Sequence, residues 1–136
     1  MNWVLLVLLT AIFYGAYNFF VKVSSGNINQ IVGAVILQLV ATLLGGAALL
    51  YLKLVNAPLD LSSKGITFAI FAGVSVGLAE ITSFYVFSKG IPASIGIPII
   101  IGGSVLVGAT LGIVFLKESL SLVQYLAVGL IIVGIA

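Results

Sequence analysis

One acidic residue in the middle of a long apolar stretch is the strongest candidate for chemistry in this sequence. Glu80, in GLAEITSFYVF, is the only charged side chain between Gly65 and Ser88. An ionised carboxylate facing hydrocarbon would cost about 3 kcal/mol or more, so such residues face protein or water and are often functional. Burial without a cationic partner favours the neutral, protonated form of a carboxyl group. Glu80 is therefore a candidate for taking up and releasing a proton.

Two interpretations of Glu80 stay open at this point. In the first, its protonation changes as water reaches it from one side of a membrane or the other, which is what a proton-coupled transporter requires. In the second, Glu80 only ties helices together, through a hydrogen bond to Asn18, to Gln38 or to a tyrosine hydroxyl.

Polar and aromatic side chains elsewhere are candidates for lining a substrate cavity. Tyr14 and Tyr17 flank Asn18 and could stack on an aromatic or cationic substrate, although aromatic residues near helix ends also act as interface anchors. Asn18 and Gln38 either contact substrate or form hydrogen bonds between helices. The cavity candidates are Tyr14, Tyr17, Asn18, Gln38, Ser83 and Phe84.

The composition excludes most other kinds of site. The chain has no cysteine and no histidine, which removes thiolate metal sites, the commonest metal ligand and the usual triad base. Its five lysines do not cluster, so nothing suggests nucleic-acid binding. We expect no enzyme activity, no cofactor and no metal site.

The same composition indicates a lipid environment. Of the 136 residues, 62% are hydrophobic and 6% are charged, whereas soluble domains average about 25% charged residues. Five apolar runs are long enough, or nearly so, to cross a bilayer as helices, which takes about 20 residues. The sequence predicts an all-α integral membrane bundle of five transmembrane helices in one domain, residues 1–136. The expected helices cover residues 3–21, 28–52, 65–88, 93–116 and 121–136, the last being short either because residues are missing after it or because it stops near the headgroups.

Every lysine lies at the end of an apolar run, where it can reach the membrane surface. With the N-terminus inside, Lys53, Lys64 and Lys117 lie on the inner side and Lys22 and Lys89 on the outer side. This balance favours N-inside only weakly. A fixed orientation and a dual topology, with copies inserted both ways, both stay open.

Small residues at spacings of four mark possible packing faces. Gly73 and Gly77 lie on the third run, and Ser104, Gly108 and Gly112 lie on the fourth. Such faces let helix backbones approach closely, either within one chain or between two.

The end of the chain resembles a known family. In IGIPIIIGGSVLVGATLGIVFLKESLSLVQYLAVGLIIVGI, residues 95–135, Pro98 leads a helix of small residues that ends at Glu118, and Gln124 follows in the next run. This pattern, and YGAYNFFVK at residues 14–22, resembles an EamA domain of the drug/metabolite transporter superfamily, with distant similarity to the small multidrug resistance proteins. Pro98 frees the carbonyl of Ser94 and either kinks the helix or serves a site.

The resemblance implies a transporter half. Most EamA proteins carry two such domains in inverted orientation, so a chain with one implies a homodimer, most simply antiparallel, with a small-molecule substrate between the copies near the midplane. The small multidrug resistance proteins carry their essential glutamate on the first helix, whereas the first run here has no acid. We interpret Glu118, beside Lys117, as a cap of the fifth helix.

These observations predict a small transporter that moves an organic solute by alternating access. In the first interpretation of Glu80, the transport is coupled to protons through this residue. We expect an integral, multi-pass protein of a prokaryotic cytoplasmic membrane. Two alternatives are a non-transporting subunit that assembles a larger membrane complex, and a channel, although too few polar residues repeat on any helical face to line a pore.

Overall fold

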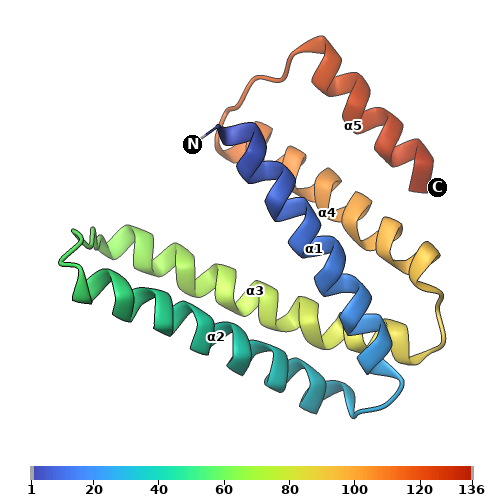
Figure 1. Cartoon of the computed structure of the whole chain (residues 1–136). Helices are drawn as coiled ribbons and strands as arrows, with labels where there is room; N and C mark the ends of the chain where they lie inside the picture. Colours follow the sequence, from blue (N-terminus) through green and yellow to red (C-terminus); the bar gives the residue numbers. More distant parts are fainter. Residues whose placement is uncertain (1, 136) are drawn as a thin grey trace. The chain divides into compact units, whose positions relative to one another are not determined.

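The computed structural model describes residues 2–135, and within that range it contains five helices and no strand. The helices are α1 (Trp3–Ser25), α2 (Gln30–Leu54), α3 (Ser63–Ser88), α4 (Ala93–Phe115) and α5 (Leu122–Ile135) (Figure 1). The predicted all-α, five-helix fold is confirmed.

The first four helices are long and apolar enough to cross a membrane. The shortest of them have 23 residues, or about 34 Å at 1.5 Å per residue, against a hydrocarbon thickness of about 30 Å. α5 has 14 residues and reaches only about 21 Å. The last predicted helix is therefore the only one that falls clearly short of a full span within the described residues.

Polar side chains fix where the first three helices begin. The side chains of Asn2, Asn29 and Ser62 accept hydrogen bonds from backbone N–H groups in the first turns of α1, α2 and α3. α1 ends four residues later than predicted, at Ser25, because the serine hydroxyl bonds back to the carbonyl of Lys22 and the turn begins only at Gly26.

The chain divides into two compact units, one ending at Gly90 and one beginning at Ile91. In the first unit, α2 and α3 form an antiparallel pair, and α1 packs on both (Figure 1). In the second unit, α4 packs on α5. The single domain expected over residues 1–136 remains a prediction.

The buried side chains of the first unit gather toward one end, which we call the packed end. It combines the last third of α1, the first turns of α2 and the last third of α3. Its members are Asn18, Val21, Ser25, Gly33, Ala34, Glu80, Ser83, Phe84 and Phe87. A close approach of α2 and α3 lies within it, because a Cβ added at Gly33 would stand 2.5 Å from the ring of Phe84.

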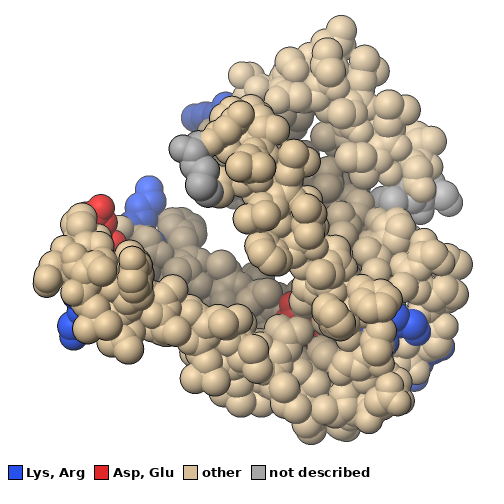
Figure 2. Space-filling model, viewed as in Figure 1, with Lys and Arg blue, Asp and Glu red and all other residues tan. Residues whose placement is uncertain are grey.

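The opposite part of the α2–α3 pair, which we call the far end, has a different character. It comprises residues 40–54 of α2 and 63–76 of α3, and all of these residues are exposed. On the face shown in Figure 2, charged side chains cover only a small part of the surface. The far end carries Lys53 and Lys64, and its other exposed side chains are uncharged and mostly apolar.

Most hydroxyl groups inside the helices are bonded within their own helix. Each donates to a backbone carbonyl three or four residues earlier, which satisfies the hydroxyl without help from another element. The residues are Thr10, Thr42, Thr67, Ser75, Thr82, Ser104 and Thr110.

The junction between α4 and α5 corrects the interpretation of Glu118. The backbone N–H of Ser121 donates to the Gln124 side chain at 2.7 Å, and the N–H of Gln124 donates to the Ser121 hydroxyl at 3.4 Å. This reciprocal pair is a capping box, so these two residues open α5. Glu118 instead turns back onto the end of α4, and its N–H donates to the carbonyl of Gly112.

The left-handed backbone of Lys117 explains this reversal. Its φ of 56° turns the chain sharply after α4, which places the Glu118 carboxylate 2.6 Å from a Cβ built at Gly112. A larger residue at Gly112 would therefore have to displace the Glu118 carboxylate, which is the end of a flexible side chain from the following loop. Pro98 lies within α4, which is helical from Ala93 to Phe115, and the predicted kink stays a prediction.

Candidate functional site

Glu80 lies in the packed end and is joined to α1 by a hydrogen bond. Its side chain exposes only 4% of its surface, and its carboxylate accepts a hydrogen bond from the hydroxyl of Tyr17. Among the partners that the sequence left open, the structure therefore selects a tyrosine. Because the partner is a neutral hydroxyl, the bond does not compensate the charge of an ionised Glu80 as a lysine would.

The neighbours of Tyr17 on α1 hold its position. The ring of Tyr14 packs edge-on against the ring of Tyr17, with the ring centres 6.1 Å apart. The buried amide of Asn18 donates to the backbone carbonyl of Tyr14 at 2.8 Å. Asn18 is therefore bonded within its own helix, and this bond supplies neither a link to another helix nor a substrate contact, the two roles considered for it.

The predicted cavity residues are only partly brought together. Tyr17, Asn18, Ser83 and Phe84 lie at the packed end with Glu80. Tyr14 is 60% exposed and contributes through its stacking on Tyr17. Gln38 does not join them. Its side-chain amide packs against Gly77 on α3, 3.7 Å from a Cβ built at that glycine.

The small residues expected to pack helices behave unequally. Gly77 accommodates Gln38, and Gly112 accommodates Glu118. At Gly73 and Gly108, a built Cβ meets no packing partner within 4 Å among the described residues. Ser104 is exposed, and its hydroxyl bonds to its own helix.

A lysine closes the outer edge of the packed end. The Lys22 ammonium donates to the backbone carbonyl of Phe87 at 3.3 Å and lies 5.8 Å from the centre of the Phe87 ring. This carbonyl belongs to the last turn of α3, where carbonyl groups lack helical partners and the helix dipole favours a positive charge. Lys22 thus links the end of α1 to the end of α3.

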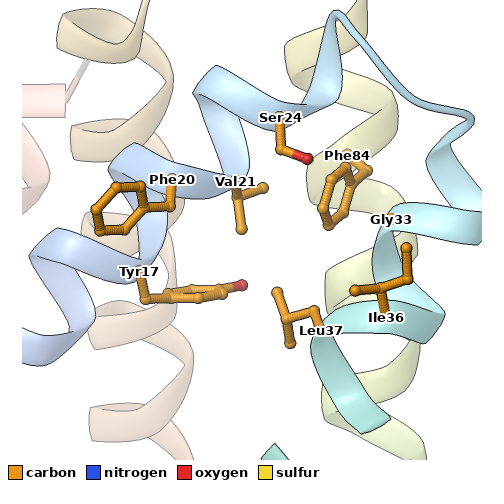
Figure 3. A pocket seen from close by; sticks show the side chains of 8 residues that line it. All are labelled: Tyr17, Phe20, Val21, Ser24, Gly33, Ile36, Leu37 and Phe84. Carbon is orange, nitrogen blue, oxygen red and sulfur yellow. The ribbon is translucent and has the colours of Figure 1, made fainter. Parts of the chain in front are cut away.

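A pocket of about 280 Å³ opens beside the Tyr17–Glu80 pair, between α1, α2 and α3. Figure 3 shows the hydroxyl of Tyr17 directed into the space bounded by Val21 and Leu37, and the hydroxyl of Ser24 on the side of Phe84. The lining residues are Tyr17, Phe20, Val21, Ser24, Gly33, Ile36, Leu37 and Phe84.

Sequence reasoning found two of these lining residues, Tyr17 and Phe84, and missed the others. Phe20, Val21, Ile36 and Leu37 are ordinary side chains for a membrane helix, so their types gave no signal. Gly33 could have been found only by knowing that it faces Phe84. Within residues 2–135, no group of three or more acidic, histidine or cysteine residues is placed to hold a metal ion.

Comparison with known proteins decides the family. A model of the EamA-like transporter family matches residues 1–136, the whole chain. This chain belongs to the EamA-like transporter family. An uncharacterized protein of Methanocaldococcus jannaschii is 34% identical over 132 residues, which cover 97% of this chain and 92% of that protein. No solved structure matches.

Membership of the EamA-like family confirms the resemblance inferred from residues 14–22 and 95–135. Together with the four apolar helices of spanning length, it identifies an integral, multi-pass membrane protein. The family is one of drug/metabolite transporters rather than enzymes, which agrees with a site built from one carboxyl group, tyrosines and apolar side chains.

Proposed function

We propose that this EamA-like chain moves a small organic solute across the membrane by alternating access and couples that movement to protons through Glu80. The observation that supports the proposal is the buried Glu80 carboxylate, bonded to Tyr17 beside a pocket in a family of transporters. A carboxyl group in such a place must lose or gain its charge according to whether water reaches it.

Tyrosine is a suitable partner for a group that changes protonation. Its hydroxyl can donate to an ionised carboxylate, and its oxygen can accept from a protonated carboxyl group. The Tyr17–Glu80 contact can therefore persist in both states, with the donor and acceptor exchanged. A lysine partner would stabilise only the ionised form, which would hinder proton release and uptake.

Alternating access in this proposal requires a second copy of the chain. A second copy in antiparallel orientation would supply the inverted repeat, with substrate held near the midplane between the copies. The open surroundings of Gly73 and Gly108 leave room for a helix of that copy. The proposed host is a prokaryotic cytoplasmic membrane.

The proton role is tested in vesicles reconstituted with the purified protein and loaded with a pH-sensitive dye. A panel of labelled amino acids, amines and neutral aromatic molecules is applied under an imposed pH gradient, and solute uptake and proton movement are recorded together. Glu80→Gln should reduce gradient-driven uptake to the level of empty vesicles. Asp60→Asn is the matched control, since Asp60 is an exposed acid in the connection between α2 and α3.

Uptake that Glu80→Gln leaves unchanged would remove the proton role. The absence of uptake for every solute, together with isolation of the chain in a complex with other proteins, would favour the alternative of an assembly subunit. Reporters fused to both termini test the antiparallel dimer, because only dual topology places each terminus on both sides of the membrane.

A further inference from the structure

The pocket at the packed end is complete within one chain. Its lining residues come from α1, α2 and α3, all of which belong to the unit that ends at Gly90. It is thus distinct from a substrate site formed between two copies. The question is which ligand its size and chemistry fit.

The size of the pocket indicates a ligand of about two fused rings. An apolar protein cavity of about 150 Å³ holds one benzene molecule, and this pocket has about 280 Å³. This volume is just below the usual range for small-molecule sites, about 300–1,000 Å³.

The chemistry of the walls indicates a neutral ligand with one polar group. All eight lining residues are uncharged, and the aromatic rings of Tyr17, Phe20 and Phe84 contribute to the wall. A charged ligand would have to lose its hydration against a lining that carries no opposite charge, which is costly. The polar side chains in the lining are the hydroxyls of Tyr17 and Ser24 (Figure 3).

We propose that this pocket binds a neutral aromatic molecule of about indole size, and that Tyr17 links its occupancy to the protonation of Glu80. Tyr17 is suited to this because its ring forms part of the wall while its hydroxyl holds the Glu80 carboxylate. A ligand acceptor group that takes over the Tyr17 hydroxyl removes a donor from Glu80. Tyr17 acts as a positioning residue for Glu80 and as a contact for the ligand.

The direction of the link follows from the strength of the competing bond. A hydrogen bond to an ionised carboxylate is roughly twice as strong as one between neutral groups. When Glu80 is protonated it can donate to the Tyr17 oxygen, which frees the hydroxyl hydrogen of Tyr17 for the ligand. The ligand therefore binds more tightly at low pH. By reciprocity, ligand binding draws a proton onto the protein. This link rests on the proposed function in taking Glu80 as a group that exchanges protons.

Other titratable groups near this pair are few. On α1, Tyr14 stacks on Tyr17, and Lys22 lies at the edge, bonded to the α3 carbonyl of Phe87. On α2, the titratable residues are Tyr51 and Lys53, both at the far end. On α3, the titratable residues besides Glu80 are Lys64 at the far end and Tyr85, which is exposed.

Fluoroindanone, a neutral aromatic ketone of about indole size whose carbonyl can accept from Tyr17, is the probe for the pocket. It is observed by fluorine NMR with the full chain in lipid nanodiscs and with empty nanodiscs as the blank. We expect a saturable signal at one molecule per chain. Phenyltrimethylammonium, a cation of similar size, should not compete. A signal no different from empty nanodiscs, as when an acyl chain fills the pocket, would overturn the inference, and so would displacement by the cation.

A pair of tryptophan substitutions on α2 places the binding site. Ile36→Trp fills the pocket from its rim and should weaken fluoroindanone binding at least about ten-fold, a typical effect of blocking an apolar contact site. Leu43→Trp adds the same group at the far end, where Leu43 is 72% exposed, and should leave affinity unchanged. Equal effects of the two variants would place the ligand elsewhere.

Variants of the bonded pair test the link separately from binding. Between about pH 8.5 and about pH 5.5, wild-type affinity should rise by about five-fold or more, the lower end of typical coupling between sites. Tyr17→Phe keeps the ring and Glu80→Gln keeps the shape, and each should bind fluoroindanone with no pH dependence. A pH dependence that survives in both variants would contradict the link.

The two proposals fail in different ways. Loss of fluoroindanone binding in a chain that still shows uptake dependent on Glu80 would overturn the pocket inference alone. Binding that responds to pH through Tyr17, in a chain that transports no solute, would overturn the transport proposal and leave the pocket intact.

Discussion

The packed end and the far end of the first unit differ both in polarity and in packing. The packed end buries Gly33 against Phe84 and joins Tyr17 to Glu80. The far end exposes every residue of 40–54 and 63–76, including the large side chains of Leu43 and Phe71. In lipid, an apolar side chain gains little by moving from hydrocarbon into protein, so close packing and polar bonds decide which residues are buried. The contrast indicates that hydropathy determines which segments enter the membrane, whereas close packing and polar bonds determine how the helices contact each other.

The largest effect is expected when the packed end loses a large side chain. Phe84 is 2% exposed, whereas Phe71, on the same helix at the far end, is 63% exposed. Phe84→Ala should lower the free energy of unfolding by about 2–3 kcal/mol, mainly through the cavity it leaves. Phe71→Ala should change it by less than about 0.5 kcal/mol, because lipid replaces the lost contacts. Unfolding by SDS in mixed micelles, followed by circular dichroism, measures both, and equal losses would contradict the contrast.

A smaller loss is expected when one methyl group is added to a close contact. Gly33→Ala places a Cβ 2.5 Å from the Phe84 ring and should cost about 1–2 kcal/mol of unfolding free energy. Gly45→Ala is the matched change at the far end, where a built Cβ meets nothing within 4 Å among the described residues. It should be neutral or slightly stabilising, since alanine favours helix over glycine. Unfolding by SDS in mixed micelles measures both variants. Unchanged unfolding free energies for both would contradict the close contact between Gly33 and Phe84.

The bond between α1 and α3 should contribute about 1 kcal/mol. Tyr17→Phe removes the hydroxyl that bonds to Glu80, and hydrogen bonds between membrane helices average somewhat under 1 kcal/mol, with a maximum near 2. Tyr51→Phe removes a hydroxyl at the far end, where Tyr51 is exposed, and should have no effect. Comparing the unfolding midpoints of the two variants isolates the bond, and a null result for Tyr17→Phe would mean that Glu80 finds another partner.

The smallest effect concerns two lysines at helix ends. Lys22 bonds to the Phe87 carbonyl at the end of α3, whereas Lys53 lies in the exposed last turn of α2. Lys22→Met should cost about 0.5 kcal/mol more than Lys53→Met, since both lose a favourable interaction with their own helix dipole but only the first loses a bond to another helix. Differential scanning calorimetry of the two variants in detergent measures this difference. A larger loss of stability for Lys53→Met than for Lys22→Met would contradict the prediction.

The sequence predicted the helices well and their contacts poorly. Runs of apolar residues bounded by lysines locate helices because the bilayer requires a minimum length and forbids unpaired backbone. The burial of Glu80 was predictable for the same reason, since an acid in such a run cannot face hydrocarbon. Its partner was not predictable, because Asn18, Gln38 and several tyrosines were chemically equivalent choices.

The errors arose where the path of the backbone, rather than the residue type, determines which side chains come into contact. The reversal at Lys117 sends Glu118 back onto Gly112 and leaves the start of α5 to Ser121 and Gln124. The pocket was missed because its walls are mostly side chains that any membrane helix contains, and only their arrangement around Gly33 makes a cavity.

The bonding of helix hydroxyls to their own backbone bears on how the protein is made. A segment whose threonines and serines are already satisfied, as at Thr10, Thr42 and Ser75, can leave the translocon and enter lipid before its neighbours exist. Glu80 depends on Tyr17, which is synthesised sixty-three residues earlier. Integration of α3 is thus the step of biogenesis at which an already inserted α1 is needed, and at which a nascent chain lacking Tyr17 would be most exposed to quality control.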